Sequence, residues 1–339
     1  NATGESGWLL LGLTGMGYAV GAQAYWVIVG EMIGIAASWG FISRKLKRLS
    51  DETDSITLPD VLAAKFDDRW HLIRGVAVAI IAVMVTTYVS AQMVATGKAF
   101  SGFIGLDYRA GVIIGAVIII SYTFVGGYKA VSYTDVVQGV LMLAGLIAVP
   151  LVAINAAGGW GGMTATLREY DPGVVDMFSV LDGSTAGFVA AVSFAAIGLP
   201  FLGVPQMLIR YMSARDDTEL KKARIVSITV LFIFLFGAVT AGIAGRALFP
   251  GLEDSEQVFP TLASELFPPL LTGVLFVIVL SAIMSTVDSL LLLASSSIVR
   301  DTMQKILGNP ASDATLAGYG KIVTVIIGVI AVFVAVYMA

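Results

Sequence analysis

The sequence predicts an all-α membrane protein that crosses the bilayer several times. Hydrophobic residues make up 57% of the chain and charged residues only 13%, and the mean hydropathy is +0.89. A soluble chain of 339 residues cannot keep that much apolar surface away from water, so we expect a lipid bilayer around it. The sequence lacks the alternating ten-residue segments that are typical of a membrane β-barrel.

Long apolar runs place the membrane-spanning helices. A run of about 18 or more apolar residues is long enough to cross the hydrocarbon core as a helix. The sequence contains about nine such segments, the first of them shorter than the rest. They lie near 6–19, 23–43, 72–100, 108–127, 133–155, 185–212, 222–247, 269–299 and 317–338.

The charges of the loops predict the orientation. Alternate loops collect sixteen of the 20 basic residues on one side and leave four on the other. Because basic loops stay in the cytoplasm, we expect the first side to be cytoplasmic and the protein to lie in the plasma membrane. The sixteen are Arg44, Lys45, Lys47, Arg48, Lys65, Arg69, Arg74, Lys129, Arg210, Arg215, Lys221, Lys222, Arg224, Arg300, Lys305 and Lys321.

Composition also excludes several classes of function. A net charge of −4 argues against nucleic acid as a partner. The chain has no cysteine, so disulfides and thiolate metal sites are excluded. Its single histidine, His71, follows Trp70 at an expected membrane edge. An intramembrane enzyme would need a nucleophile–base pair or a metal cluster, and neither is visible, so we do not expect an enzyme.

Two segments interrupt the helical pattern. Residues 197–205 carry two prolines and two glycines in the middle of a span, which breaks the hydrogen-bond ladder. Broken helices often form binding sites near the membrane midplane, although a simple proline kink is the alternative. Residues 1–8 are small and polar and run directly into an apolar span, either as a loop or as a second break.

The span at 269–299 carries oxygen side chains on one face. Ser285, Asp288 and Ser289 are spaced i, i+3 and i+4, with Thr286 beside them. Hydroxyl and carboxylate oxygens suit a small hard cation. Hydrogen bonding between helices explains the hydroxyls but not a buried aspartate, so an ion site is favoured.

Other polar residues in spans allow more than one interpretation. Asp135 follows the start of a span and could cap it as a helix N-terminal residue. Glu31, in the second span, could be a protonated hydrogen-bonding carboxyl, a proton-coupling group or a solute contact. Tyr88, with Ser90 and Gln92, forms a polar patch that suits either a helix interface or a pocket.

Six short motifs follow one another along the chain. They are Ser6-Gly7-Trp8-Leu9-Leu10-x-Gly12, Leu58-Pro59-Asp60, Tyr122-Thr123-x-x-Gly126-Gly127, Ser132-Tyr133-Thr134-Asp135-x-x-Gln138, Gly203-x-Pro205-Gln206 with Arg210-Tyr211-Met212, and Met284-Ser285-Thr286-x-Asp288-Ser289. In this order they resemble the sodium/solute symporter family, nearest its sodium/proline branch, and the resemblance covers essentially the whole chain.

The resemblance implies a five-plus-five inverted-repeat fold like that of a bacterial leucine transporter. On that scheme residues 1–339 form a single transmembrane transporter domain that is incomplete at both ends. It would lack the first half of core helix 1 and core helix 10.

The resemblance also implies Na⁺ as the coupling ion. The family's main sodium site would comprise the backbone carbonyls of Ala2, Glu5 and Ala282 and the hydroxyls of Ser285 and Thr286. A second sodium site, used by some members, would fall on Asp135, Ser285, Asp288 and Ser289.

The solute positions follow from the same resemblance. They are Ser6, Trp8, Gly12, Glu31, Tyr88, Phe201 and Pro205. Glu31 lies where some sugar-transporting relatives contact their substrate. The chain departs from the proline branch at Ile197, where that branch has an aromatic residue, and at Gly4, where it has an aspartate.

The function implied is sodium-coupled import of a small organic solute by alternating access, with proline or a similar amino acid as the first candidate. A monocarboxylate such as pantothenate or acetate is the alternative solute. A different class of function is the transporter-like sensory input module of a histidine kinase.

Overall fold

The computed structural model describes residues 3–337 and contains only helices and loops over that range. The helices of the first half are η1 (Trp8–Leu13), α1 (Thr14–Val20), η2 (Gly21–Ala24), α2 (Tyr25–Ala37), η3 (Ser38–Ile42), α3 (Ser43–Glu52), α4 (Leu58–Lys65), α5 (Leu72–Ile104), α6 (Tyr108–Ala156) and α7 (Gly159–Tyr170). Those of the second half are η4 (Pro172–Val175), α8 (Thr185–Ala196), η5 (Leu199–Leu202), α9 (Pro205–Met212), α10 (Asp217–Leu248), η6 (Ser255–Gln257), α11 (Val258–Leu266), α12 (Pro269–Ser296), η7 (Ser297–Ile306) and α13 (Asp313–Tyr337).

Within the described residues, seven continuous helices are long and apolar enough to cross a membrane. Two of them each contain two of the segments expected from the sequence. Trp8–Glu52 turns at Gly21, whose φ is 62°, and Tyr108–Ala156 breaks at Gly127, whose φ is 65° and ψ 176°. Glycine adopts these angles at little cost. The expectation of a multi-span helical membrane protein is therefore confirmed.

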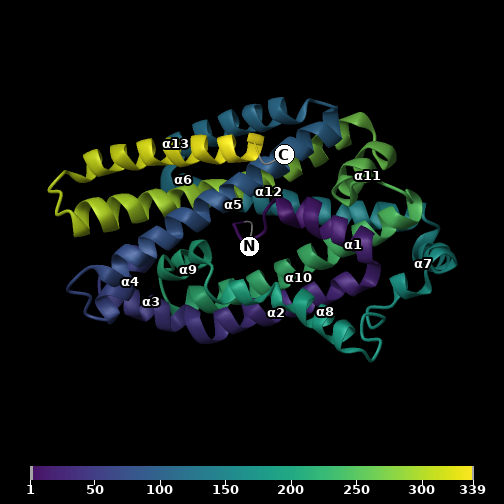
Figure 1. The fold of residues 1–339 in the computed structure, drawn as a ribbon, viewed down its shortest axis with the longest axis horizontal. Coiled ribbons are helices and arrows are strands. Elements are labelled where there is room, and N and C mark those ends of the chain that lie inside the picture. The colour runs from purple at the N-terminus through teal and green to yellow at the C-terminus, as the bar shows by residue number, and fades with distance from the viewer. Residues whose placement is uncertain (1–2, 338–339) are drawn as a thin grey trace.

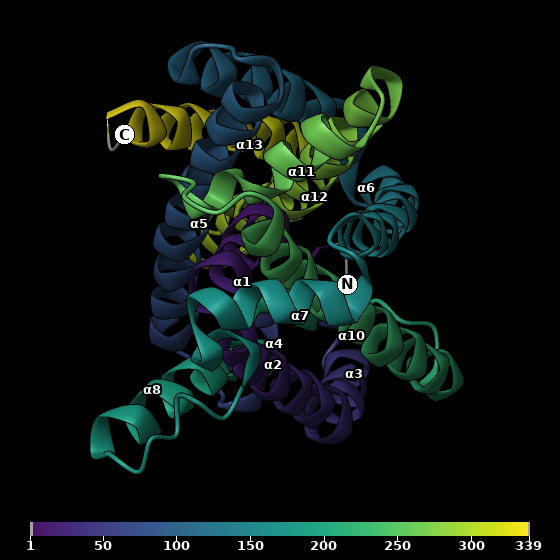
Figure 2. The same cartoon turned by 90° about the vertical axis from the view of Figure 1, so that its right-hand side faces the viewer.

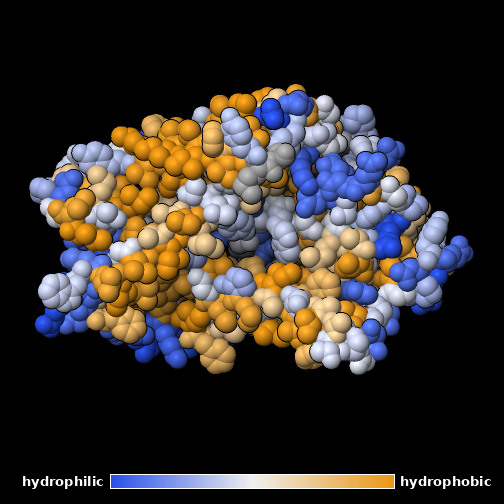
Figure 3. Space-filling model, in the orientation of Figure 1, coloured by the Kyte–Doolittle hydropathy of each residue, from blue (hydrophilic) through white to orange (hydrophobic). Residues whose placement is uncertain are grey.

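The long helices lie side by side along one axis of the molecule (Figure 1). α12 packs against α5 and α6, and α10 packs against α1 and α6. At the right-hand end of Figure 1 the short helix α7 lies across the bundle, as Figure 2 shows. Apolar side chains cover much of the middle of the surface and polar ones gather toward the two ends (Figure 3), as expected for a molecule with a lipid-facing belt.

Small residues bring particular helices into backbone contact. A Cβ on Gly242 of α10 would lie 2.0 Å from the Thr14 carbonyl oxygen of α1. A Cβ on Gly30 of α2 would lie 1.8 Å from the Ala195 oxygen of α8, and one on Gly198 would lie 1.9 Å from the Gly30 oxygen. Such close approach is typical of helix pairs in membranes. It fixes α2 against the segment where the sequence predicts a broken helix.

A buried ion cluster joins three elements at the end of the bundle that carries α3 and α4. The Arg74 guanidinium donates to Asp60 of α4 and to Asp301 of η7, both at 2.5 Å. Thr57 Oγ1 donates to the second Asp301 oxygen at 2.7 Å. Burial opposes the ionised form of Asp60, but the hydrogen bond and charge of Arg74, aided by Arg300, outweigh it and lower the pKa of Asp60.

Candidate ion- and solute-binding site

Both segments that interrupt the helical pattern lack a continuous α-helix in the part of the chain that the structure describes, and they are called the first break (residues 3–6) and the second break (residues 197–204) below. Residues 3–6 are non-helical and lead into η1, so the polar start of the chain is not a regular helix over these residues. The second break lies between α8 and α9, where only the short 3₁₀ turn η5 interrupts non-helical backbone. Pro200 and Pro205 supply no N–H to a continuous ladder, which explains why the helix stops there.

Gly7 packs the first break closely against two long helices, α5 and α12. Its N–H donates to Gln92 Oε1 of α5 at 3.0 Å. A Cβ on Gly7 would lie 2.8 Å from Ile283 of α12 and 2.9 Å from Ala95 of α5. Only glycine lets the backbone approach this closely, so the break lies directly beside the part of α12 that carries the predicted sodium ligands.

The predicted main sodium ligands of α12 converge on one carbonyl. Ser285 Oγ donates to the Ala282 oxygen at 3.0 Å, and Thr286 Oγ1 donates to the same oxygen at 3.2 Å. All three residues are fully buried. These oxygens could turn toward a monovalent cation instead. Of the other expected ligands, Glu5 is 2% exposed in the break, and Ala2 lies outside the described residues.

Asp135 lies inside α6, and its interpretation as a helix N-terminal cap is wrong. The helix resumes directly after Gly127, two turns earlier, and the Tyr122 hydroxyl donates to Thr134 Oγ1 across the break. The Asp135 carboxylate instead faces the first helix break, where Thr3 Oγ1 donates to its Oδ2 at 3.0 Å.

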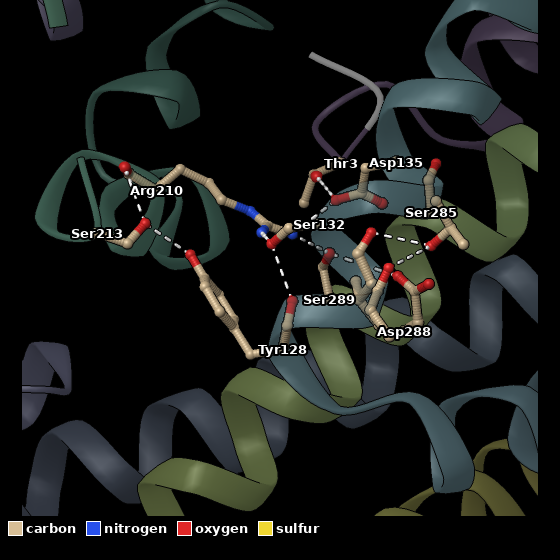
Figure 4. A network of polar contacts seen from close by, with 12 residues as sticks. Thr3, Tyr128, Ser132, Asp135, Arg210, Ser213, Ser285, Asp288 and Ser289 are labelled. Atoms are coloured by element: carbon tan, nitrogen blue, oxygen red, sulfur yellow. Dashed lines mark hydrogen bonds and ion pairs between the residues drawn. The ribbon is translucent and has the colours of Figure 1, made fainter. Parts of the chain in front are cut away.

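The guanidinium of Arg210 bridges two of the four predicted ligands of the second sodium site, Asp135 and Ser289 (Figure 4). Its Nη2 donates to Asp135 Oδ2 at 2.7 Å and to Ser289 Oγ at 2.9 Å, and its Nη1 donates to Ser132 Oγ at 2.6 Å. Two predicted ligands, one from α6 and one from α12, are thus joined by a positive charge that belongs to the protein itself.

Two carboxylate oxygens of this cluster keep free lone pairs. Ser289 Oγ lies 3.4 Å from Asp288 Oδ1. Asp288 Oδ2 and Asp135 Oδ1 are buried without a hydrogen-bond partner among the described residues. The arrangement therefore retains acceptors for a further small cation near the guanidinium.

From the sequence, Arg210 is expected on the cytoplasmic side and belongs to one family motif, but it has no predicted role in a site. The available signal was its position: it follows Pro205 by five residues, one turn and a half into α9. A basic side chain so close to a break inside the membrane needs an internal partner. Only the fold identifies Asp135 as that partner.

Four predicted solute residues lie together next to the first break. Ser6 is buried and accepts a hydrogen bond from the Trp8 N–H at 3.1 Å. The hydroxyl of Tyr88 on α5 interacts with Ser6. A Cβ on Gly12 would lie 2.5 Å from Cδ1 of Trp8, so Gly12 leaves room for the indole to fold back along η1.

The remaining three predicted solute residues come from other elements. Glu31 of α2 is fully buried and interacts electrostatically with Glu5 and Tyr88, which places it in the same region. Phe201 lies in η5 and Pro205 begins α9, both half-buried on the second helix break.

A cavity of about 770 Å³ lies next to the first break, and Figure 3 shows a hollow in the middle of the face that it draws. It is open to the surface and reaches the polar cluster. Its lining includes Thr3, Gly4, Trp39, Asp135 and Arg210. The part of the cluster on α6 and α9 is therefore accessible to ions.

The sequence profile of the sodium:solute symporter family matches residues 1–339, and the chain belongs to this family. It is 35% identical over 339 residues to "High-affinity proline transporter PutP" of Bacillus subtilis, covering 98% of this chain and 71% of that protein. It is 34% identical over 342 residues to "Sodium/proline symporter" of Staphylococcus aureus, covering 98% of this chain and 66% of that protein. These relatives are transporters and not enzymes.

Solved structures support the fold. A Na⁺-coupled sialic acid symporter in a substrate-bound outward-open state matches with a TM-score of 0.82 at 19% identity, over 99% of this chain and 72% of that one. MhsT in complex with L-phenylalanine matches with a TM-score of 0.67 at 17% identity, over 98% and 77%. The expected inverted-repeat, leucine-transporter-like architecture is confirmed.

Proposed function

We propose that residues 1–339 form one transport domain that couples the entry of sodium to the import of a small organic solute. The observation that carries this proposal is the convergence of Ser285 and Thr286 on the Ala282 carbonyl, beside a helix break seated by Gly7. Hydroxyl and carbonyl oxygens in a buried, membrane-embedded position suit a monovalent cation.

Sodium bound between the first break and α12 would stabilise the conformation that receives the solute. The solute would lie at the two breaks, on Ser6, Trp8, Gly12, Glu31, Tyr88, Phe201 and Pro205. Proline or a similar amino acid is the first candidate because the curated relatives are named as proline transporters. Movement of the bundle around this site would then release the ion and the solute on the opposite side.

The end of the molecule that carries α3 and α4 would face the cytoplasm, since the basic loops gather there. With the protein in the plasma membrane, each sodium ion that enters gains about 2.3 kcal/mol per 100 mV of membrane potential. That energy drives the accumulation of the solute.

The test is solute uptake by the full-length protein in proteoliposomes, measured over a range of sodium concentrations. Ser285→Ala and Thr286→Ala each remove one oxygen ligand, and we expect the half-saturating sodium concentration to rise about tenfold, the equivalent of about 1.4 kcal/mol. The matched control is Ser296→Ala on the same helix, whose hydroxyl donates only to the Leu293 oxygen. An unchanged sodium dependence in both site variants refutes the assignment.

A further inference from the structure

Glu31 has an environment unlike that of the other buried acids. It lies on the inward face of α2 with Val27, Ile28, Gly34 and Ile35 and is 0% exposed. Within the described residues, neither of its carboxyl oxygens has a hydrogen-bond partner. Asp60 and Asp301, by contrast, are each held by the Arg74 guanidinium. Glu31 therefore lacks the compensation that a buried carboxylate normally receives.

The groups that face Glu31 do not supply a positive charge. Glu5 of the first break and Tyr88 of α5 interact with it electrostatically, and neither carries a positive charge. Among the described residues, Glu31 forms no ion pair. Arg210 forms its ion pair with Asp135. A carboxylate enclosed in this way costs several kcal/mol, and either a proton or a cation that joins it removes that cost.

Three backbone N–H groups at the start of η1 already have hydrogen-bond acceptors. The N–H groups at the start of η1 would otherwise be suited to an anion, because a helix N-terminus attracts negative charge. Here the Gly7 N–H donates to Gln92 Oε1 at 3.0 Å. The Trp8 N–H donates to the Ser6 hydroxyl at 3.1 Å, and the Leu9 N–H donates to the Ser6 backbone carbonyl at 3.0 Å. These three N–H groups are therefore not free to bind an anion, whereas both Glu31 carboxyl oxygens lack a hydrogen-bond partner among the described residues.

We propose that this transporter favours a solute of net positive charge, whose ammonium nitrogen binds the Glu31 carboxylate. The inference rests on the proposed function as regards sodium coupling, and it replaces a zwitterion such as proline with a cation as the preferred solute. The aromatic rings of Trp8 and Tyr88, both half-buried in the same group of residues, suit such a nitrogen because an ammonium is attracted to ring faces. A solute carboxylate, which a zwitterion such as proline brings, finds fewer partners here.

The experiment compares matched solutes that differ in charge. The purified full-length protein is heated in sodium and in potassium buffer, and a rise in Tm reports binding. The probes are L-proline against L-prolinamide, glycine betaine against choline, and cyclopentanecarboxylate, which has no nitrogen. We expect at least one cation to bind about tenfold more tightly than its zwitterionic partner in sodium, and cyclopentanecarboxylate not to bind.

Variants then assign the preference to Glu31. Glu31→Gln should lose the preference for the cation, Glu31→Asp should retain it with weaker binding, and the exposed Glu265→Gln should match the parent protein. If Glu31→Gln does not fold, the test is whether the parent protein and Glu31→Asp both bind the cationic probes more tightly than the zwitterionic ones. Sodium-dependent binding that favours the zwitterions, or a preference that survives Glu31→Gln, overturns this inference and leaves sodium coupling intact. No sodium-dependent shift with any probe overturns both proposals.

Discussion

The position of Arg210 predicts that this residue limits how many sodium ions bind. Its guanidinium lies between two of the oxygens that the resemblance assigns to a second sodium ion, 2.7 Å from Asp135 and 2.9 Å from Ser289. A sodium ion can use these oxygens only if the guanidinium moves away. The variant Arg210→Gln removes the charge and keeps a polar side chain of moderate length, so it should open the site.

The magnitude follows from the geometry. Two unit charges about 4 Å apart interact by about 4 kcal/mol at an effective dielectric constant near 20. The Arg210 side chain is 25% exposed and that of Asp135 is 12% exposed, so solvent screening reduces the gain to about 1–3 kcal/mol. A competing internal cation of that strength lowers the affinity for sodium at Asp135 by about 5- to 150-fold.

The assay is the thermal stability of the purified protein as a function of sodium concentration, with uptake in proteoliposomes as a second readout. We expect Arg210→Gln to show a steeper sodium dependence and an additional binding step at lower sodium concentration than the parent protein shows. Arg210→Lys, which keeps the charge, should resemble the parent, and so should Arg215→Gln, whose side chain is 83% exposed. A folded Arg210→Gln protein with the parent's sodium curve would refute the reasoning.

Two further predictions concern packing and the buried ion cluster. Gly30→Ala should disrupt the contact of α2 with α8 and lower Tm or transport, because its Cβ would lie 1.8 Å from a backbone oxygen. Gly273→Ala, which has open space around it, should change neither. Equal behaviour of the two variants would contradict this packing. Asp60→Asn should lower the stability by about 1–3 kcal/mol at neutral pH, since the Arg74 hydrogen bonds and charge are partly lost. Because the pKa of Asp60 lies below its ordinary value of 3.8, its contribution is complete above that pH and is lost as the pH falls through the lowered pKa. The difference in Tm between the parent and Asp60→Asn should therefore shrink below about pH 4, and a difference that is constant with pH would count against the ion cluster.

The sequence by itself determined the features that depend on near neighbours along the chain. Apolar runs located the spans, since the length of a helix must match the thickness of the bilayer. Pro200 and Pro205 located the second break, because proline removes backbone donors. Helical periodicity placed Ser285 and Asp288 on one face of α12, and both are buried.

Only the tertiary structure decided which of these features meet. Arg210 and Asp135 are 75 positions apart, and Arg74 and Asp301 are 227 apart. No local pattern encodes such pairs, because they arise from how glycine-lined helix surfaces such as that of Gly30 pack. The lack of a hydrogen-bond partner for Glu31 within residues 3–337 is also a property of the whole fold, since a side chain is left unpaired only once every neighbouring helix is in place.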